Sequence, residues 1–254
     1  MATSLRPDAL YLALDTSGPL GSVAVGTGSR VLARAFLDRQ GRHAAEVIPR
    51  ISECMAEAGA RMRELAGVVV GAGPGSFTGV RVAAATAKGI AHALGIPLWP
   101  FSSLEAAAVS ERVISALPGL PSGAPAARAD RARYVLFDAR GDRVYAACYE
   151  LRAQGVAEMV PPHATRIREL LEEEVPPGTW FAGDGAVRHE AALRAAGHPV
   201  LPAPAGMPTA DGLLHLLTLH AERGPAPDPG RWEPEYVKAS SAERARNPSG
   251  AWIG

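Results

Sequence analysis

The chain has 254 residues, of which 47% are hydrophobic and 20% charged, a composition typical of globular proteins and unlike that of disordered chains. Lysine plus arginine and aspartate plus glutamate number 26 each, so the whole chain lacks the positive excess that attracts nucleic acid. No apolar run approaches the about 18 residues of a membrane-spanning helix, and no secretory signal pattern is present. We therefore expect a cytoplasmic protein in which Cys54 and Cys148 stay reduced.

The first half of the chain begins with a strand meander. Residues 10–17 predict an apolar strand that reaches Asp15, residues 22–26 predict the return strand, and residues 30–37 could add a third. Residues 43–58 predict a helix with one apolar stripe. The stripe consists of Val47, Ile48, Ile51, Cys54, Met55 and Ala58.

A glycine-rich turn follows the next predicted strand, whose apolar run is 68–70. The turn contains Gly73, Gly75 and Gly79, and a helix of small residues is expected from Val80. Free N–H groups at such a helix start can bind an anion, but the simpler role is a tight turn. The segment is no phosphate-binding P-loop, because no Lys-Ser or Lys-Thr pair follows Gly79. The dinucleotide fingerprint also fails, since its third glycine position is Ser76.

The second half repeats the same order of elements. A strand at 134–137 reaches Asp138, a turn at 140–142 follows, and 144–149 predict the return strand. The remaining expected elements are a helix at 165–174, a strand and turn at 180–185, and a helix at 186–196. The predicted division is an N-terminal subdomain at 1–117, a Pro/Gly/Ala-rich loop at 118–132, and a C-terminal subdomain with a tail at 133–254.

No catalytic or metal-ligating set emerges from the residues. None of the seven histidines forms an i, i+4 pair, the spacing that places two imidazoles on one helix face. Ser76 and Thr78 have no neighbouring His or Lys to act as a base, and we expect at least one of them to cap a helix. Asp15 and Asp138 are expected to stabilise their own turns.

Three motifs resemble the TsaB (YeaZ) family in content and order. They are residues 12–25 with Asp15, residues 73–81 (GPGSFTGVR), and residues 138–145 (DARGDRVY). The resemblance implies a duplicated α/β fold of the actin-like and sugar-kinase-like superfold, with two mixed-sheet subdomains flanked by helices. It also implies a non-catalytic subunit that pairs with TsaD and supports threonylcarbamoyl transfer to the adenosine beside the anticodon of tRNA.

The resemblance implies further partners and residues. The partners are the TsaE ATPase, tRNA through the complex, and a second copy of the chain when it is alone; ATP or ADP would act at the level of the complex. The vestigial nucleotide or anion site would consist of Asp15, Gly73, Gly75, Ser76, Thr78, Gly79 and Asp138. The interface residues would be Val47, Ile51, Met55 and Arg81.

Two alternatives stay open at the level of the residues. One is an ATP-binding kinase or ATPase of the same superfold, which Asp15, Asp138 and the glycine turn could serve. The other is a direct tRNA-binding module with basic residues in the tail, namely Arg231, Lys238, Arg244 and Arg246.

Overall fold

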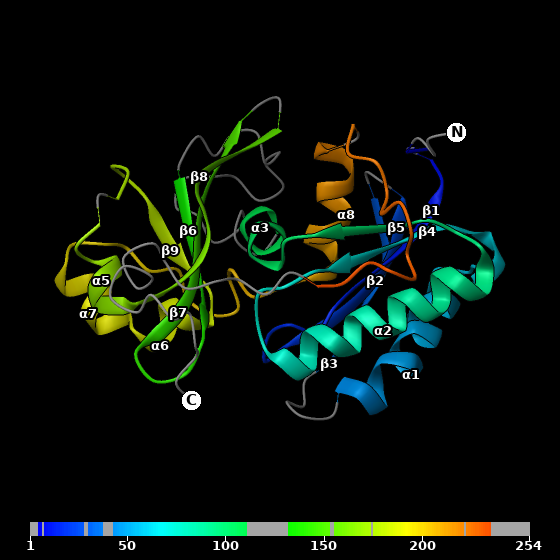
Figure 1. The fold of residues 1–254 in the computed structure, drawn as a ribbon, viewed down its shortest axis with the longest axis horizontal. Helices are drawn as coiled ribbons and strands as arrows, with labels where there is room; N and C mark the ends of the chain where they lie inside the picture. The colour runs from blue at the N-terminus through cyan, green and yellow to red at the C-terminus, as the bar shows by residue number, and fades with distance from the viewer. Residues whose placement is uncertain are drawn as a thin grey trace.

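The computed structural model describes residues 5–6, 8–27, 30–37, 43–110, 132–152, 155–173, 175–220 and 222–234. Two mixed β-sheets with their helices form two lobes that lie side by side along the long axis of the molecule (Figure 1). The predicted loop at 118–132 lies outside the described residues except for Ala132, as do Lys238, Arg244 and Arg246 of the tail.

The first lobe contains a five-stranded sheet in the order β3-β2-β1-β4-β5. β1 is antiparallel to β2 and parallel to β4, so the meander is followed by a crossover through α1. The strands are β1 (Leu10–Asp15), β2 (Gly21–Thr27), β3 (Arg30–Leu37), β4 (Leu65–Gly71) and β5 (Leu98–Phe101). The helices are α1 (His43–Glu57), the 3₁₀ turn η1 (Met62–Glu64), α2 (Phe77–Leu94) and α3 (Ser103–Val109).

The second lobe contains a four-stranded sheet in the order β8-β7-β6-β9. β6 is antiparallel to β7 and parallel to β9. The strands are β6 (Ala132–Asp138), β7 (Arg143–Arg152), β8 (Gly155–Arg166) and β9 (Trp180–Ala182). The helices that follow are α5 (Ile167–Leu170), α6 (Asp184–Arg188), α7 (Glu190–Ala195) and α8 (Ala210–Leu219).

The two sheets repeat one topology, which confirms the duplicated α/β fold. In each lobe an antiparallel meander of three strands is followed by a strand parallel to the first. The predicted helix at 165–174 shortens to α5, because Thr165 and Arg166 still pair in β8. α2 begins at Phe77, three residues earlier than predicted, because Ser76 caps it.

Both faces of the first sheet are covered by helices. Leu12 and Leu14 of β1 point into a core shared with α1 and α2, while Tyr11 and Ala13 point into a core shared with α8. Alternate residues of a strand face opposite sides, so β1 reads as an unbroken apolar run. This explains why Asp15, at the end of that run, is also buried.

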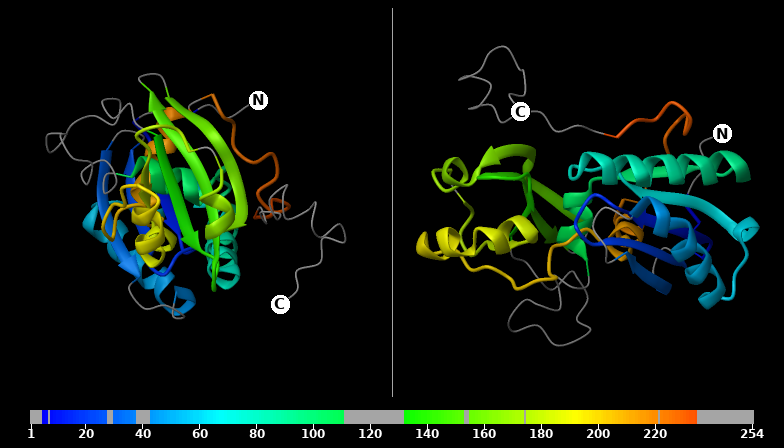
Figure 2. Two further views of the ribbon diagram at one scale, coloured as in Figure 1. Left: turned by 90° about the vertical axis from the view of Figure 1, so that its left-hand side faces the viewer. Right: turned by 90° about the horizontal axis from the view of Figure 1, so that it is seen from below.

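The C-terminal part of the chain returns to the first lobe, which corrects the predicted subdomain at 133–254. α8 packs on β1, β2 and β4, and the Ala226 N–H donates to the Leu98 carbonyl of β5 at 2.8 Å. The Lys88 ammonium of α2 donates to the Trp232 carbonyl at 2.8 Å. In the right-hand view of Figure 2 this segment, in orange, runs along α2. Sequence order alone gives no sign of this return, because it depends on long-range packing.

Candidate functional site

The glycine turn between β4 and α2 packs directly against the turn that follows β1. The Ser76 N–H donates to the Ser17 carbonyl at 2.7 Å, and the Thr16 hydroxyl donates to the Gly79 carbonyl at 2.6 Å. A Cβ atom at Gly79 would lie 1.9 Å from the Thr16 carbonyl oxygen, so only glycine allows this approach. Two of the three motifs found in the sequence therefore meet at one place.

Part of the hydrogen-bonding capacity of the glycine turn is used within the chain. The Gly73 N–H donates to Ser103 Oγ at 3.2 Å, and the Gly79 N–H donates to Ser76 Oγ at 3.3 Å. The second bond is the N-cap of α2, which confirms the predicted capping role for Ser76. Thr78 is exposed beside it. An anion at this turn would compete with these internal bonds.

Asp15 is a fully buried carboxyl group at the end of β1. Its Oδ1 accepts a hydrogen bond from the Ser17 N–H at 2.8 Å, the turn-stabilising bond predicted for it. Its Oδ2 is buried without a hydrogen-bond partner within the described ranges. Burial raises the pKa of Asp15, and Ser17, Ser103 and His43 oppose that shift. The charged form of Asp15 is thus disfavoured.

Asp138 occupies the corresponding position in the second lobe but has different surroundings. Its Oδ1 accepts from the Arg140 N–H at 2.9 Å, again the predicted turn bond. Its Oδ2 pairs with the Arg188 guanidinium at 2.7 Å, and its backbone N–H donates to Asp184 Oδ1 at 3.3 Å. Burial raises the pKa of Asp184 to about 6. Asp138 is therefore an ion-paired surface carboxylate, whereas Asp15 is an unpaired buried one.

The two aspartates do not fit a metal-bound nucleotide. Asp15 has no exposed oxygen, and Arg188 already neutralises Asp138. No hydrogen bond or ion pair joins Asp138 to Asp15 or to the glycine turn in the part of the chain that the structure describes. Within those same residues, no group of three or more His, Cys, Asp or Glu side chains could hold a metal ion. The structure brings Asp15 and the glycine turn together and leaves Asp138 apart from them.

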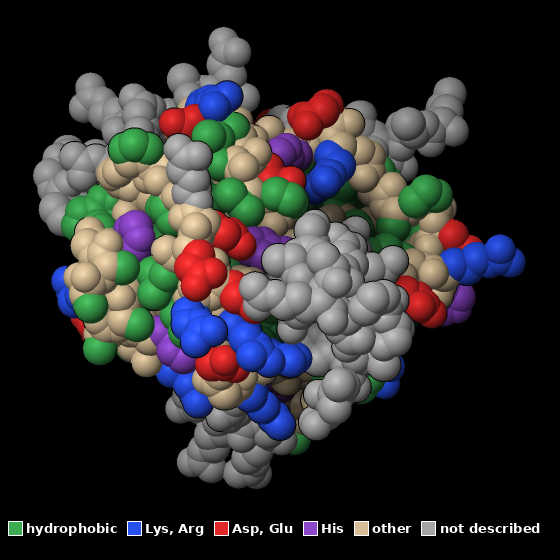
Figure 3. Space-filling model, turned by 60° about the vertical axis from the view of Figure 1, so that its left-hand side comes forward, with side chains coloured by type: hydrophobic (Ala, Val, Ile, Leu, Met, Phe, Trp, Pro, Cys, Tyr) green, Lys and Arg blue, Asp and Glu red, His purple; other side chains and the backbone are tan. Residues whose placement is uncertain are grey.

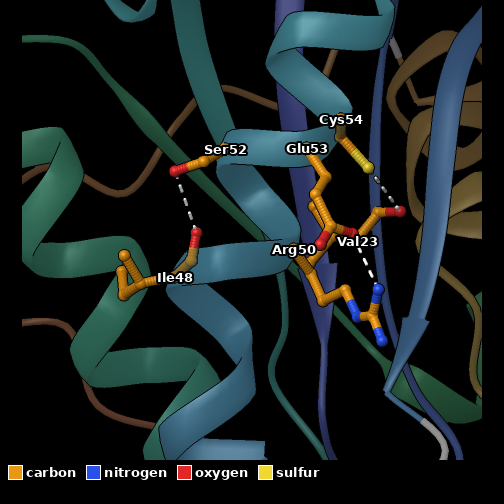
Figure 4. Close-up of polar contacts among 6 residues, drawn as sticks. All are labelled: Val23, Ile48, Arg50, Ser52, Glu53 and Cys54. Atoms are coloured by element: carbon orange, nitrogen blue, oxygen red, sulfur yellow. Dashed lines mark hydrogen bonds and ion pairs between the residues drawn. The ribbon is translucent and has the colours of Figure 1, made fainter.

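The aliphatic interface residues predicted on α1 lie inside the chain. Val47, Ile51 and Met55 are 2%, 3% and 4% exposed and pack in the core beneath α1 and α2. The structure corrects this prediction, because the first sheet itself buries the apolar stripe of the helix. On the same side of α1, Cys54 Sγ lies 3.8 Å from the Val23 carbonyl oxygen of β2 (Figure 4).

The outward face of the α1 and α2 pair carries exposed apolar side chains instead. Ile48 is 54% exposed and Phe77 is 56% exposed. Figure 4 shows Ile48 and Ser52 on the side of α1 away from Cys54. The Arg81 guanidinium lies 3.7 Å from the centre of the Phe77 ring, which places this predicted residue at the surface.

A pocket of about 650 Å³ between β5, β8 and the C-terminal segment was not foreseen from the sequence. Its walls include Phe101, Glu105, Glu158 and Arg223. Beside it, His220 Nε2 lies 2.6 Å from Glu105 Oε1, and this hydrogen bond raises the pKa of His220. The residues come from distant parts of the chain without a shared motif, so no local signal could have identified them.

Within the described ranges, none of the helices combines the length and apolar character needed to cross a membrane.

Comparison with known proteins gives the family of the chain. The family model described as TsaD, tRNA N6-adenosine threonylcarbamoyltransferase, matches residues 38–194, more than half of the chain. The TsaB tRNA threonylcarbamoyladenosine biosynthesis protein of Bacillus subtilis is 29% identical over 63% of this chain and 64% of that protein. The protein of the same name from Haemophilus influenzae is 39% identical over 38% of this chain and 41% of its own length. The chain thus matches less than two thirds of each of these relatives.

Solved structures agree over a longer stretch. YeaZ from Pseudomonas aeruginosa has a TM-score of 0.69 and 25% identity, covering 90% of this chain and 100% of that one. A second Pseudomonas aeruginosa structure, described as similar to peptidase YeaZ, has a TM-score of 0.71 at 25% identity and covers 91% of this chain. With the family model and these relatives in agreement, the chain belongs to the TsaB (YeaZ) family within the wider TsaD family.

Proposed function

We propose that this chain acts in the synthesis of threonylcarbamoyladenosine in tRNA as a non-catalytic subunit that pairs with TsaD. The printed names of its relatives, TsaB proteins of tRNA threonylcarbamoyladenosine biosynthesis, support the pathway. The match to the TsaD family model supports pairing between two chains of similar fold. In the proposed complex TsaD carries out the transfer, the TsaE ATPase supplies nucleotide chemistry, and tRNA is bound by the assembly.

The observation that carries the non-catalytic role is the state of the two turn aspartates. A group that holds a metal-bound phosphate must be charged and reachable, because the interaction is between opposite charges. Asp15 is buried with its pKa raised, and Asp138 is paired with Arg188 at 2.7 Å. These environments favour a turn that stabilises the fold over one that binds nucleotide.

The outward face of α1 and α2 is the surface we assign to TsaD. Ile48 and Phe77 are the large apolar side chains exposed on these two helices within the described residues. Ala85 and Gly89 are also exposed on α2 and would let a partner helix approach closely. Apolar anchors beside small residues suit a helix-on-helix contact, in which ridges of one helix enter grooves of the other. Arg81 lies at the edge of this surface against Phe77.

Co-elution with TsaD tests the surface. Ile48→Arg with Phe77→Arg should abolish co-elution, because each change places a charge in an apolar contact. Met159→Arg is the matched control, since Met159 is 44% exposed on β8 in the other lobe. Both variants should keep the circular dichroism and melting temperature of the wild type, because the replaced side chains are largely exposed. Co-elution of the folded double variant at the wild-type level would refute the assignment.

Reconstituted transfer tests the function itself. Threonylcarbamoyl transfer to tRNA is measured with TsaD, TsaE and the activated donor, with and without this chain, and with this chain in the absence of TsaD. The proposal requires transfer to depend on both this chain and TsaD. Transfer by this chain without TsaD would contradict the non-catalytic role, and transfer that is indifferent to this chain would contradict the whole proposal.

A further inference from the structure

Five arginines gather around the turn between β6 and β7 in the second lobe. Arg143 of β7 stands directly opposite Arg166 of β8 in the antiparallel register. Arg140 lies in the turn itself, and its N–H bonds to the same aspartate that pairs with Arg188. Arg168 is in α5, which is tied to the turn because the Ile167 N–H donates to the Asp142 carbonyl at 2.9 Å. We call these five residues, Arg140, Arg143, Arg166, Arg168 and Arg188, the arginine patch.

Acidic side chains neutralise only part of the arginine patch. Asp138 pairs with Arg188 at 2.7 Å, and Asp142 lies 3.8 Å from Arg166. No ion pair involves Arg140 or Arg168 in the described part of the chain, and both are exposed. Arg143 and Glu169, which follows Arg168 in α5, each have a further partner. Five cations outnumber the carboxylates of Asp138, Asp142 and Glu169, so the patch is positive although the whole chain is neutral. In Figure 3 basic side chains gather in one area of the face shown, with a few acidic ones among them.

The register brings Arg143 and Arg166 opposite each other, which places two basic side chains together at the ends of β7 and β8. The local structure is unfavourable for arginine at position 140. Arg140 has a φ of 70°, a left-handed conformation that glycine and asparagine adopt at lower cost. A polyanion bound here would use the exposed arginine that this turn carries.

We infer that the arginine patch binds the phosphate backbone of RNA. The guanidinium group is planar and stays charged, and its fork of donors matches phosphate oxygens. Side chains from a turn, two strand ends and the two short helices α5 and α6 form a broad surface that suits several phosphates along a backbone. Contacts to phosphates position RNA on the protein and carry no sequence information directly. This inference rests on the proposed function, because tRNA is the RNA that the complex would present.

The test neutralises two arginines without disturbing the fold. Arg140→Asn suits the left-handed backbone at this position, and Arg168→Gln keeps a polar exposed side chain. The matched control is Arg30→Gln with Arg63→Gln, two exposed arginines of the first lobe. Binding of a fluorescein-labelled unmodified tRNA transcript is followed by anisotropy from 50 to 300 mM salt, with the chain alone and with TsaD present. Co-elution of each variant with TsaD is measured in parallel.

Loss of two phosphate contacts should reduce the slope of log affinity against log salt by about 1.4–1.8 and weaken binding about tenfold or more near 0.1 M salt. The control pair should leave slope and affinity unchanged. An unchanged slope in the patch variant, or no tRNA binding by the wild type in either arrangement, would overturn the inference. Loss of TsaD co-elution with unchanged tRNA binding would also overturn it, because the patch would then contact protein. If the wild type binds tRNA through the patch but never co-elutes with TsaD, the proposed function fails and this inference stands.

Discussion

Two glycines of α2 should respond in opposite directions to the same substitution. Gly79 lies in the first turn of the helix, where an added Cβ would meet the Thr16 carbonyl oxygen at 1.9 Å. Gly89 lies in the same helix with nothing within 4 Å of an added Cβ. Alanine is a better helix former than glycine by about 1 kcal/mol, and that gain applies at both positions. At Gly79, but not at Gly89, the substitution also creates a clash with the backbone.

The clash sets the size of the expected effect. Forcing a methyl group into a packed contact costs about 1–3 kcal/mol, and weakening the Thr16 to Gly79 hydrogen bond costs about 1 kcal/mol more. After the helix-propensity gain of about 1 kcal/mol is subtracted from these costs, Gly79→Ala should lower the free energy of unfolding by about 1–3 kcal/mol. Gly89→Ala should raise it by about 1 kcal/mol. For a chain of this length, 1 kcal/mol corresponds to about 2–4 °C in melting temperature.

Urea denaturation and thermal melts of both variants measure these differences on the purified chain. Circular dichroism reports the helices, and the slope of the urea transition shows whether unfolding remains comparable between variants. If Gly79→Ala were as stable as the wild type, the glycine turn would not lie against the turn after β1, and the site geometry described above would be wrong. Equal losses at Gly79 and Gly89 would mean that α2 is sensitive to substitution in general.

Three further changes test the site and its surroundings. Ser76→Ala should cost about 1 kcal/mol through loss of the helix cap, while Ser76→Asp should retain it, as equilibrium urea unfolding can establish. The hydrogen bond to Glu105 raises the pKa of His220. The stability that protonated His220 contributes is therefore complete below its ordinary pKa of 6.5 and is lost as the pH rises through the raised pKa. His220→Gln should remove this pH dependence of stability between pH 6 and 9. Because burial raises the pKa of Asp15, the contribution of this carboxyl to stability should fall as the pH rises above 3.8. Compared with the wild type, Asp15→Asn should therefore be relatively more stable at pH 7 than at pH 4. A wild-type advantage that grows toward pH 7 would show that the chain needs the carboxylate.

The elements that the sequence predicted correctly are those set by local patterns. Apolar runs and turn residues located the first two strands of each meander, and the repeated order of elements revealed the duplication. The third strand of the second meander, β8, was not predicted. A cap was expected from Ser76 or Thr78, because a hydroxyl at a helix start bonds to a free N–H close by in the chain, and Ser76 forms it. Each of these features depends on residues within a few positions of one another.

The errors concern surfaces that only tertiary packing defines. An apolar stripe on α1 is compatible with the chain's own sheet or with a partner, and the sheet occupies it at Val47, Ile51 and Met55. The return of α8 to the first lobe and the pairing of His220 with Glu105 bring together segments that are far apart in the chain. Pattern and spacing carry no information about such contacts, because the same residues would give the same pattern on either lobe.

Asp15 and Asp138 occupy equivalent positions in the two repeats but have different chemical surroundings. Both are the last residue of the first strand of a meander, and both accept the bond that stabilises the next turn. Asp15 lies in a sheet covered by helices on both faces, so burial opposes its charge. Asp138 lies at the edge of the arginine patch, where it forms an ion pair with Arg188 and its turn carries Arg140. The duplicated turn therefore stabilises the fold in the first lobe and orients a basic surface in the second. A search for one nucleotide site shared by both turns would miss this difference in role.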